Sequence, residues 1–174
     1  MLLSIKEMEV RKVRFDETFE PGSIDFSGED LEQRSGLRAV GSAEMLARSD
    51  GQVRVQGRYS VEMAAMCDRC LGDARFPLDA SFDLYYRPMS DIAVEEEVEI
   101  DEGEAEIGFY EGDGLQLEDI LLEQVVLALP MQRVCSEACK GICPVCGRNR
   151  NETVCDCRVE SADDRWGALR KLEL

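Results

Sequence analysis

Apolar and polar residues alternate strictly along the middle of the chain. In residues 53–63 the odd positions are apolar, small or aromatic and the even positions are polar. In residues 76–86 the even positions are apolar, and the odd positions are mostly polar. A period of two is typical of strands with one buried and one solvent-exposed face. The pattern predicts two strands, and a less regular run at residues 37–47 predicts a third.

Turn signals connect these three strands into an antiparallel β-meander. Ser49-Asp50-Gly51 contains Asp-Gly, the usual hairpin signal, between the first strand and the second. Cys67 and Cys70 lie between the second strand and the third, which places them at a hairpin tip. Within residues 1–35, Val13 and Phe15 alternate with charged residues and predict a further short strand.

The spacing of apolar residues becomes helical at residues 117–129. Apolar side chains recur there at Leu117, Ile120, Leu121, Val125, Ala128 and Leu129. Glu118 and Asp119 complement the helix dipole in the first turn, and Pro130 ends the helix. The apolar stripe predicts that this main helix packs against the sheet.

Residues 91–114 carry eleven acids and no base, which predicts a solvated loop. We expect a small hairpin at its end, containing Ile107, Phe109 and Leu115. An alternative interpretation is that the loop attracts a basic partner. Near the C-terminus, Ser161 and Asp164 resemble a capping box, which predicts a short helix containing Trp166 and Leu169.

These elements predict an α+β fold with two parts. Residues 1–134 are expected to form a β-rich core domain, in which one main helix packs on the meander. Residues 135–174, which contain six of the eight cysteines, are expected to form a cysteine-rich zinc lobe with a C-terminal helix.

The eight cysteines carry the strongest chemical signal. Cys67 and Cys70, like Cys143 and Cys146, form a C-x2-C group with a glycine within two residues of its second cysteine. Such groups are typical of zinc knuckles, and four thiolates close one tetrahedral site. Eight cysteines therefore predict two zinc ions per chain.

Spacing also predicts how the cysteines divide between the two sites. Cys155 and Cys157 share one face of an extended segment, close enough in sequence to join the second knuckle. Cys135 and Cys139, taken as an i, i+4 pair on a helical turn, remain for the distant first knuckle. The predicted sites are Cys67, Cys70, Cys135 and Cys139, and Cys143, Cys146, Cys155 and Cys157. An alternative first site joins Cys135 and Cys139 to Cys143 and Cys146.

Other uses of the cysteines are less consistent with the sequence. A disulfide framework suits short secreted chains, and residues 1–10 contain no secretory signal. An iron–sulfur cluster also uses four cysteines, and a single C-x2-C pair can be redox-active. Asn151-Glu152-Thr153 matches a glycosylation sequon, but we interpret it as a polar loop between ligand pairs.

Composition restricts the possible functions. The net charge is −17, so the chain repels free phosphate backbones. The chain has no histidine and no Gly-rich nucleotide-binding motif, which argues against an enzyme and against a small-molecule substrate. The sequence contains no run of 18 apolar residues, so it does not predict a membrane-spanning helix.

Five segments of the chain, in this order and spacing, match a known family. They are C-D-R-C-L at 67–71, L-L-E-Q-V-V-L-A-L-P at 121–130, C-K-G-I-C-P-V-C-G-R-N-R-N at 139–151, C-D-C at 155–157 and D-D-R-W-G-A-L-R-K-L at 163–172. With these segments the sequence resembles the bacterial YceD family of large ribosomal RNA subunit accumulation proteins. The resemblance implies a cytoplasmic, non-catalytic factor for accumulation of large-subunit ribosomal RNA. It also implies that family genes often neighbour a gene for a large-subunit ribosomal protein. Some relatives lack most of the cysteines between 143 and 157, which implies an accessory role for that site.

Three functional hypotheses follow. The chain is an assembly factor that contacts a basic ribosomal or ribosome-assembly protein. Alternatively, it is a zinc-ribbon module that binds ribosomal RNA through Lys140, Arg148 and Arg150, or a thiol-based redox or zinc sensor. The charge favours the first hypothesis, and closed four-thiolate sites disfavour the third because they shield the sulfurs.

Overall fold

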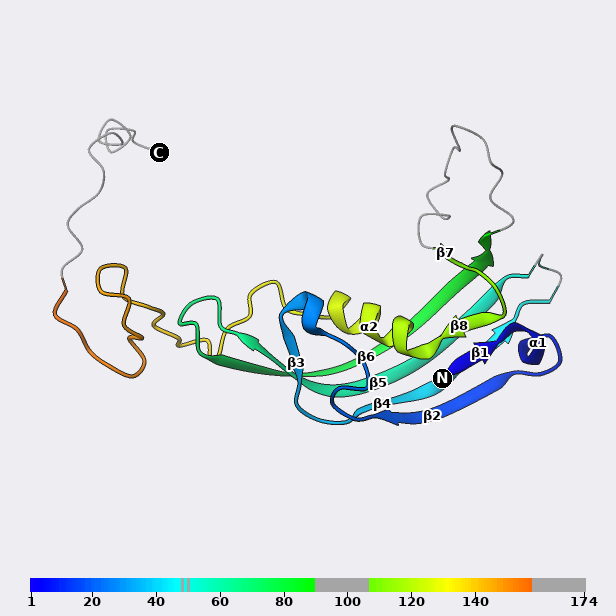
Figure 1. The fold of residues 1–174 in the computed structure, drawn as a ribbon, viewed down its shortest axis with the longest axis horizontal. Helices are drawn as coiled ribbons and strands as arrows, with labels where there is room; N and C mark the ends of the chain where they lie inside the picture. The colour runs from blue at the N-terminus through cyan, green and yellow to red at the C-terminus, as the bar shows by residue number, and fades with distance from the viewer. Residues whose placement is uncertain (48, 50, 90–106, 158–174) are drawn as a thin grey trace, which may run out of the picture. The chain divides into compact units, whose positions relative to one another are not determined.

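The alternating segments form one six-stranded sheet (Figure 1). The computed structural model describes residues 1–47, 49, 51–89 and 107–157. The strands of the sheet are β2 (Val13–Phe19), β3 (Leu31–Gln33), β4 (Leu37–Met45), β5 (Val53–Met66), β6 (Asp73–Pro88) and β7 (Ile107–Tyr110). Their order is β2-β4-β5-β6-β7, and β3 pairs with β5 beside this path.

The three predicted meander strands are present and adjacent. β4 pairs antiparallel with β5, with Ala39 opposite Tyr59, and β5 and β6 are neighbours joined by a short turn. The short strand predicted around Val13 and Phe15 is β2, which pairs antiparallel with β4. The sheet is not purely antiparallel, however, because β7 runs parallel to β6, with Gly108 opposite Tyr86.

The hairpin predicted for residues 107–115 is wrong. Strand β8 (Gly114–Gln116) does not pair with β7 but lies antiparallel to β1 (Leu2–Ser4), with Leu115 opposite Leu3. Leu3 is fully buried and Leu115 is 8% exposed. Pairing with the N-terminal strand thus buries Leu115, and burial of apolar area favours this arrangement. The acidic segment 91–106 lies outside the described residues.

The alternation predicts the buried face of the sheet correctly. In β5 the side chains of Val53, Val55, Tyr59 and Val61 are buried, whereas the residues between them are more exposed. Gly41 lies opposite Gly57 at a point of close packing. A Cβ at Gly41 would lie 2.6 Å from the ring of Phe15, and one at Gly57 would lie 2.9 Å from the ring of Phe82. These aromatic rings occupy the space that the glycines leave.

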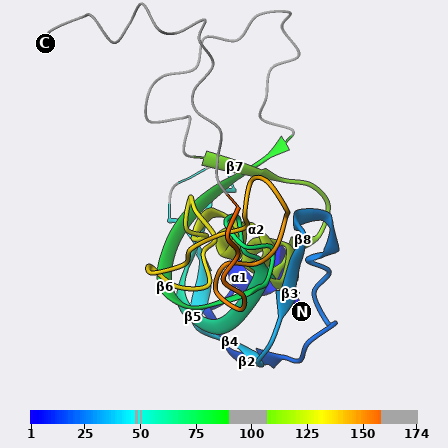
Figure 2. The ribbon, with the colours of Figure 1, turned by 90° about the vertical axis from the view of Figure 1, so that its left-hand side faces the viewer.

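The main helix, α2 (Leu117–Leu127), covers this buried face. Seen end-on in Figure 2, strands β2, β4, β5 and β6 follow one another around a curve that has α2 on its inner side. The four helix residues that are buried are Leu117, Ile120, Leu121 and Val125. The Tyr59 hydroxyl donates a hydrogen bond of 2.8 Å to the carbonyl of Gln124, and burial raises the pKa of Tyr59. Sheet and helix thus share one core, as predicted.

The remaining described elements are short. Helix α1 (Ile5–Met8) follows β1, and the 3-10 turn η1 (Ser27–Glu29) precedes β3. The helix predicted near Trp166 lies outside the described residues. Within the described chain, no helix has the length and apolar character required to cross a membrane.

The chain divides into two units. The β-rich unit comprises Met1–Ala65 and Arg75–Arg133, and the cysteine-rich unit comprises Met66–Ala74 and Val134–Leu174. The tip of the β5–β6 hairpin therefore belongs to the cysteine-rich unit, which contains all eight cysteines.

Candidate metal centres

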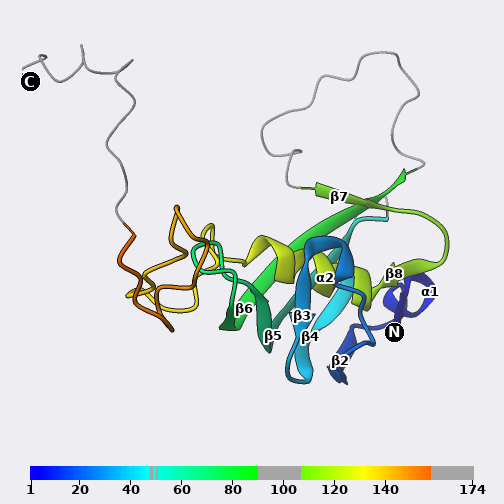
Figure 3. The ribbon, with the colours of Figure 1, turned by 60° about the vertical axis from the view of Figure 1, so that its left-hand side comes forward.

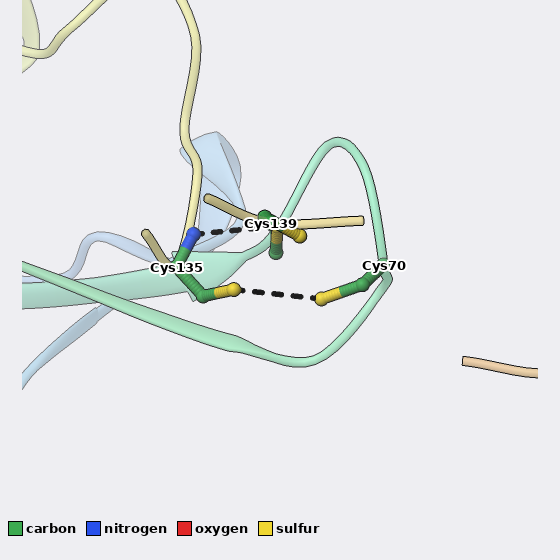
Figure 4. Close-up of side chains that lie close together, drawn as sticks. Cys70, Cys135 and Cys139 are labelled. Carbon is green, nitrogen blue, oxygen red and sulfur yellow. Dashed lines mark hydrogen bonds between the residues drawn. The ribbon is translucent and has the colours of Figure 1, made fainter. Parts of the chain in front are cut away.

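Cys67, Cys70, Cys135 and Cys139 form the first cysteine group. Their sulfurs all lie within 4.8 Å of one another. The sulfurs of Cys67 and Cys139 are 3.9 Å apart, and those of Cys70 and Cys135 are 3.7 Å apart and point toward one another (Figure 4). Four sulfurs at about 2.3 Å from a tetrahedral zinc ion would be about 3.8 Å apart. The group therefore has the dimensions of a four-thiolate site.

A tight turn presents the first two cysteines of this group. The backbone N–H of Leu71 donates to the carbonyl of Cys67 over 2.9 Å, and the N–H of Cys67 donates to the carbonyl of Gly72 over 2.7 Å. The other two cysteines come from the segment after α2, where the N–H of Cys135 donates to the Cys67 sulfur over 3.3 Å. The backbone of this turn and segment thus directs all four sulfurs to one point.

The helical turn predicted for Cys135 and Cys139 is wrong. The chain between them contains a β-turn at residues 136–139, in which the Cys139 N–H donates to the Ser136 carbonyl over 3.1 Å. The first site therefore does not depend on helical spacing. Two cysteines four positions apart can approach each other in a turn as well as in a helix, and here both face the hairpin tip that carries Cys67 and Cys70.

The second group contains Cys143, Cys146, Cys155 and Cys157, whose sulfurs also lie within 4.8 Å of one another. The structure therefore brings the cysteines together in the two groups that their spacing predicts, and not in the alternative group of residues 135–146. Gly147 adopts a φ of +70°, and its N–H donates to the Cys143 carbonyl over 2.8 Å. This positive φ is one that glycine adopts without steric cost.

Leu71 occupies in the first knuckle the place that Gly147 occupies in the second. Each lies four residues after the first cysteine of its knuckle, and each N–H bonds back to that cysteine's carbonyl. The φ of Leu71 is +60°, a conformation that is rare for a bulky residue. Its side chain is 57% exposed, so little packing compensates for the strained backbone.

In each group the pKa of at least one thiol is lowered and that of at least one other thiol is raised. Burial would raise the pKa of Cys67, but backbone N–H groups of Cys135 and Cys70 lower it to about 6. The sulfurs of Cys139 and Cys70 raise the pKa of Cys135 to about 12. Crowded thiols cannot all ionise without a counter-charge, so a divalent cation at the centre would stabilise the fully deprotonated group.

The second group shows the same division. Backbone N–H groups of Cys146 and Val145 lower the pKa of Cys143 to about 6, and the Cys146 sulfur raises the pKa of Cys157 to about 12. This group is the more accessible one. Three cysteines of the first group are buried, whereas only Cys143 is buried in the second.

Asn151 is a site residue that the sequence interpretation missed. Its side-chain N–H donates to the Cys139 sulfur over 3.3 Å and lowers the pKa of that thiol. Its side-chain oxygen accepts the N–H of Lys140 over 2.8 Å. Because Asn151 lies in the loop between Cys146 and Cys155, it connects the loop of the second group to a sulfur of the first. A sequon gives no signal for this role, since the contact depends on tertiary structure.

Residues 55–173 match the family described as large ribosomal RNA subunit accumulation protein YceD. This match covers well over half of the chain and includes all eight cysteines. The chain belongs to the YceD family. The resemblance drawn from the sequence is thereby confirmed, and the name of the family implies a role in accumulation of the large ribosomal RNA subunit.

YceD relatives of this chain occur in bacteria and in a plant. Protein YlbN of Bacillus subtilis is 27% identical over 173 residues, which cover 98% of this chain and 94% of the relative. Protein Rv2926c of Mycobacterium tuberculosis is 31% identical over 118 residues, which are 67% of this chain and 54% of the relative. The large ribosomal RNA subunit accumulation protein YCED homolog 1, chloroplastic, of Arabidopsis thaliana is 42% identical over 48 residues, which are 28% of this chain and 15% of the relative. No solved structure matches the chain significantly.

Two of the three bases predicted to contact RNA line one pocket of this YceD chain. Lys140 and Arg150 line this pocket together with Thr153, Val154 and Cys155, and its volume is about 390 Å³. Arg148 is not part of this lining, although the described chain includes it. Its carbonyl instead accepts the N–H of Cys143 over 2.8 Å, so its backbone supports the second cysteine group.

Proposed function

We propose that each cysteine group binds one zinc ion, which gives two structural zinc ions per chain. The ligands are those of the two groups, Cys67, Cys70, Cys135 and Cys139, and Cys143, Cys146, Cys155 and Cys157. Sulfur separations of 3.7 Å and 3.9 Å in the first group support the proposal, as do the backbone N–H groups that lower the pKa of Cys67 and Cys143. Four protein thiolates leave no open coordination position, so the zinc ions would be structural.

We further propose that the protein is a non-enzymatic cytoplasmic factor that supports accumulation of large-subunit ribosomal RNA by binding a basic ribosomal or ribosome-assembly protein. The observation that carries this proposal is the net charge of −17. Such a charge accelerates encounter with a cationic protein and opposes encounter with RNA. Two closed four-thiolate zinc sites would each add a further two negative charges. Membership of the YceD family supports the link to the large subunit.

Direct binding of ribosomal RNA is a second candidate function, favoured by one specific observation. Lys140 and Arg150 line the same pocket of the cysteine-rich unit. Neither forms an ion pair with another described residue, and a phosphate group is the kind of anion that two such cations bind. The excess of negative charge on the chain nevertheless weakens any such contact at long range.

A binding experiment separates these functions. The purified protein is offered RNA-free large-subunit ribosomal proteins and, separately, protein-free large-subunit ribosomal RNA, both at near-physiological salt. We expect the protein to retain one or a few basic proteins. This binding should survive treatment with nuclease and weaken as the salt concentration rises. Retention of the RNA alone, abolished by Lys140→Ala with Arg150→Ala, would instead show that the cysteine-rich unit binds RNA.

A further inference from the structure

A groove of the β-rich unit is lined by residues of β6, β7, β8 and α2. Figure 3 shows how these four elements run in the unit. Its volume is about 270 Å³. It is lined by Tyr86 of β6, by Phe109, Tyr110 and Glu111 at the end of β7, by Gly114, Leu115 and Gln116 of β8, and by Asp119, Ile120 and Glu123 of α2. The lining thus combines aromatic and aliphatic side chains with acidic ones, and it contains no base.

Three acids of this groove carry charge that the described chain does not neutralise. Glu111, Asp119 and Glu123 are exposed, and none of them forms an ion pair with another described residue. Asp119 and Glu123 lie four positions apart on α2, where like charges destabilise a helix slightly. The Glu123 carboxylate also adds to the effect of burial in raising the pKa of Tyr86 to about 12. The three acids therefore line the same groove as the aromatic residues Tyr86 and Phe109.

The polar face of the sheet provides an internal comparison. There the acids are matched with bases, as in the pair of Arg54 with Asp83 at 2.6 Å and the pair of Arg58 with Asp79 at 3.5 Å. In this respect the acids of the groove differ from those of the sheet's polar face. In addition, strand β7 directly follows residues 91–106 in the sequence, and nine of these sixteen residues are acidic.

Phe109 provides an apolar contact at the same place. Its ring is 44% exposed, on a strand that has only β6 as a partner within the described chain. An exposed aromatic residue among acids suits a segment that carries both an apolar side chain and several Lys or Arg residues. Bare RNA lacks the positive charge that this groove requires.

We propose that this groove is the surface that binds a basic segment of the partner protein. The partner's Lys and Arg residues face Glu111, Asp119 and Glu123, and an apolar side chain contacts Phe109. This inference rests on the proposed function, because it locates on the chain the basic partner that the function requires.

The test compares two variants of equal charge, using purified large-subunit ribosomal proteins offered one at a time. The groove variant carries Glu111→Gln, Asp119→Asn and Glu123→Gln. The control variant carries Glu9→Gln, Glu17→Gln and Glu20→Gln, three exposed acids far from the groove in sequence. Each variant removes three negative charges, so general electrostatic attraction falls equally in both. Thermal unfolding of both variants verifies that they are folded.

We expect the groove variant to bind its ribosomal protein at least about tenfold more weakly than wild type, and the control variant to differ by less than about threefold. Phe109→Ala alone should weaken binding by about fivefold or more. Equal losses in the two triple variants would overturn the groove as the binding surface while the proposed function stands. If wild type binds none of the proteins and binds ribosomal RNA instead, both the groove and the proposed function are wrong.

Discussion

The side-chain amide of Asn151 donates a hydrogen bond to the sulfur of Cys139 over 3.3 Å. Through this bond a loop that belongs to the second cysteine group stabilises a thiolate of the first. Hydrogen bonds to ligand atoms of this kind typically change metal affinity by roughly 10- to 100-fold. Asn151 therefore provides a direct way to weaken one site without removing a ligand.

Replacement of Asn151 by Ala should weaken zinc binding at the first site by roughly tenfold. The thiolate of Cys139 loses its hydrogen bond, and the Lys140 N–H loses the acceptor that lies at 2.8 Å. Competition with a chromophoric chelator measures the change. Thr153→Ala in the same exposed loop is the matched control and should bind as wild type does. Unchanged affinity in the Asn151 variant would show that the bond does not support the site.

Loss of a ligand should have different effects at the two sites. Cys67 is fully buried, and its sulfur accepts the backbone N–H of Cys135, whereas Cys146 is exposed. Cys67→Ser should therefore unfold the cysteine-rich unit, and Cys146→Ser should disorder mainly residues 143–157, because structural zinc contributes several kcal/mol of folding energy. Amide hydrogen exchange at residues 66–74 distinguishes these outcomes. Rapid exchange there in the Cys146 variant would contradict the difference.

The strained backbone of Leu71 predicts an unusual order of stability. At ordinary positions Ala is more stable than Gly by roughly 0.5–1 kcal/mol. At a φ of +60° the order reverses, and we expect Leu71→Gly to be more stable than Leu71→Ala by about 1 kcal/mol. Denaturant unfolding of the two zinc-loaded variants measures the difference. A more stable Ala variant would mean that the turn does not hold this conformation in solution.

The hydroxyl of Tyr59 should stabilise the β-rich unit. It connects β5 to the Gln124 carbonyl near the end of α2, and Tyr59 is only 2% exposed. Tyr59→Phe keeps the aromatic packing but removes this bond, so we expect a loss of about 1 kcal/mol in the free energy of unfolding. Tyr85→Phe on β6 is the control and should cost less, because Tyr85 is only half-buried. Equal losses in the two variants would argue against a specific role for the bond.

Much of the fold could be predicted because it depends on local periodicity. Alternation in residues 53–63 and 76–86 identifies β5 and β6 and their buried faces, and helical spacing identifies α2. Strand β8 could not be placed in the same way. Its three residues carry little pattern, and their partner, β1, lies more than 100 residues away in the sequence. Pairing over such a separation is decided by the shared core and not by local propensity.

The cysteine groups could be predicted for a different reason. Four sulfurs must meet within a few ångströms, so close spacing in the sequence leaves few possible groupings. The conformation between Cys135 and Cys139 could not be predicted, since a β-turn and a helical turn both bring such residues together. The bond from Asn151 to Cys139 depends on a tertiary contact, which no motif encodes. The positive φ of Leu71 could not be predicted, because a leucine gives no signal of the conformation that Gly147 adopts at the equivalent position.

Native mass spectrometry of the protein purified without chelator tests the central claim most directly. The account predicts two zinc ions per chain, with loss of the ion at the exposed second group before the ion at the buried first group as chelator is added. A chain that carries one zinc ion or none, or the additional mass of an iron–sulfur cluster, would contradict it.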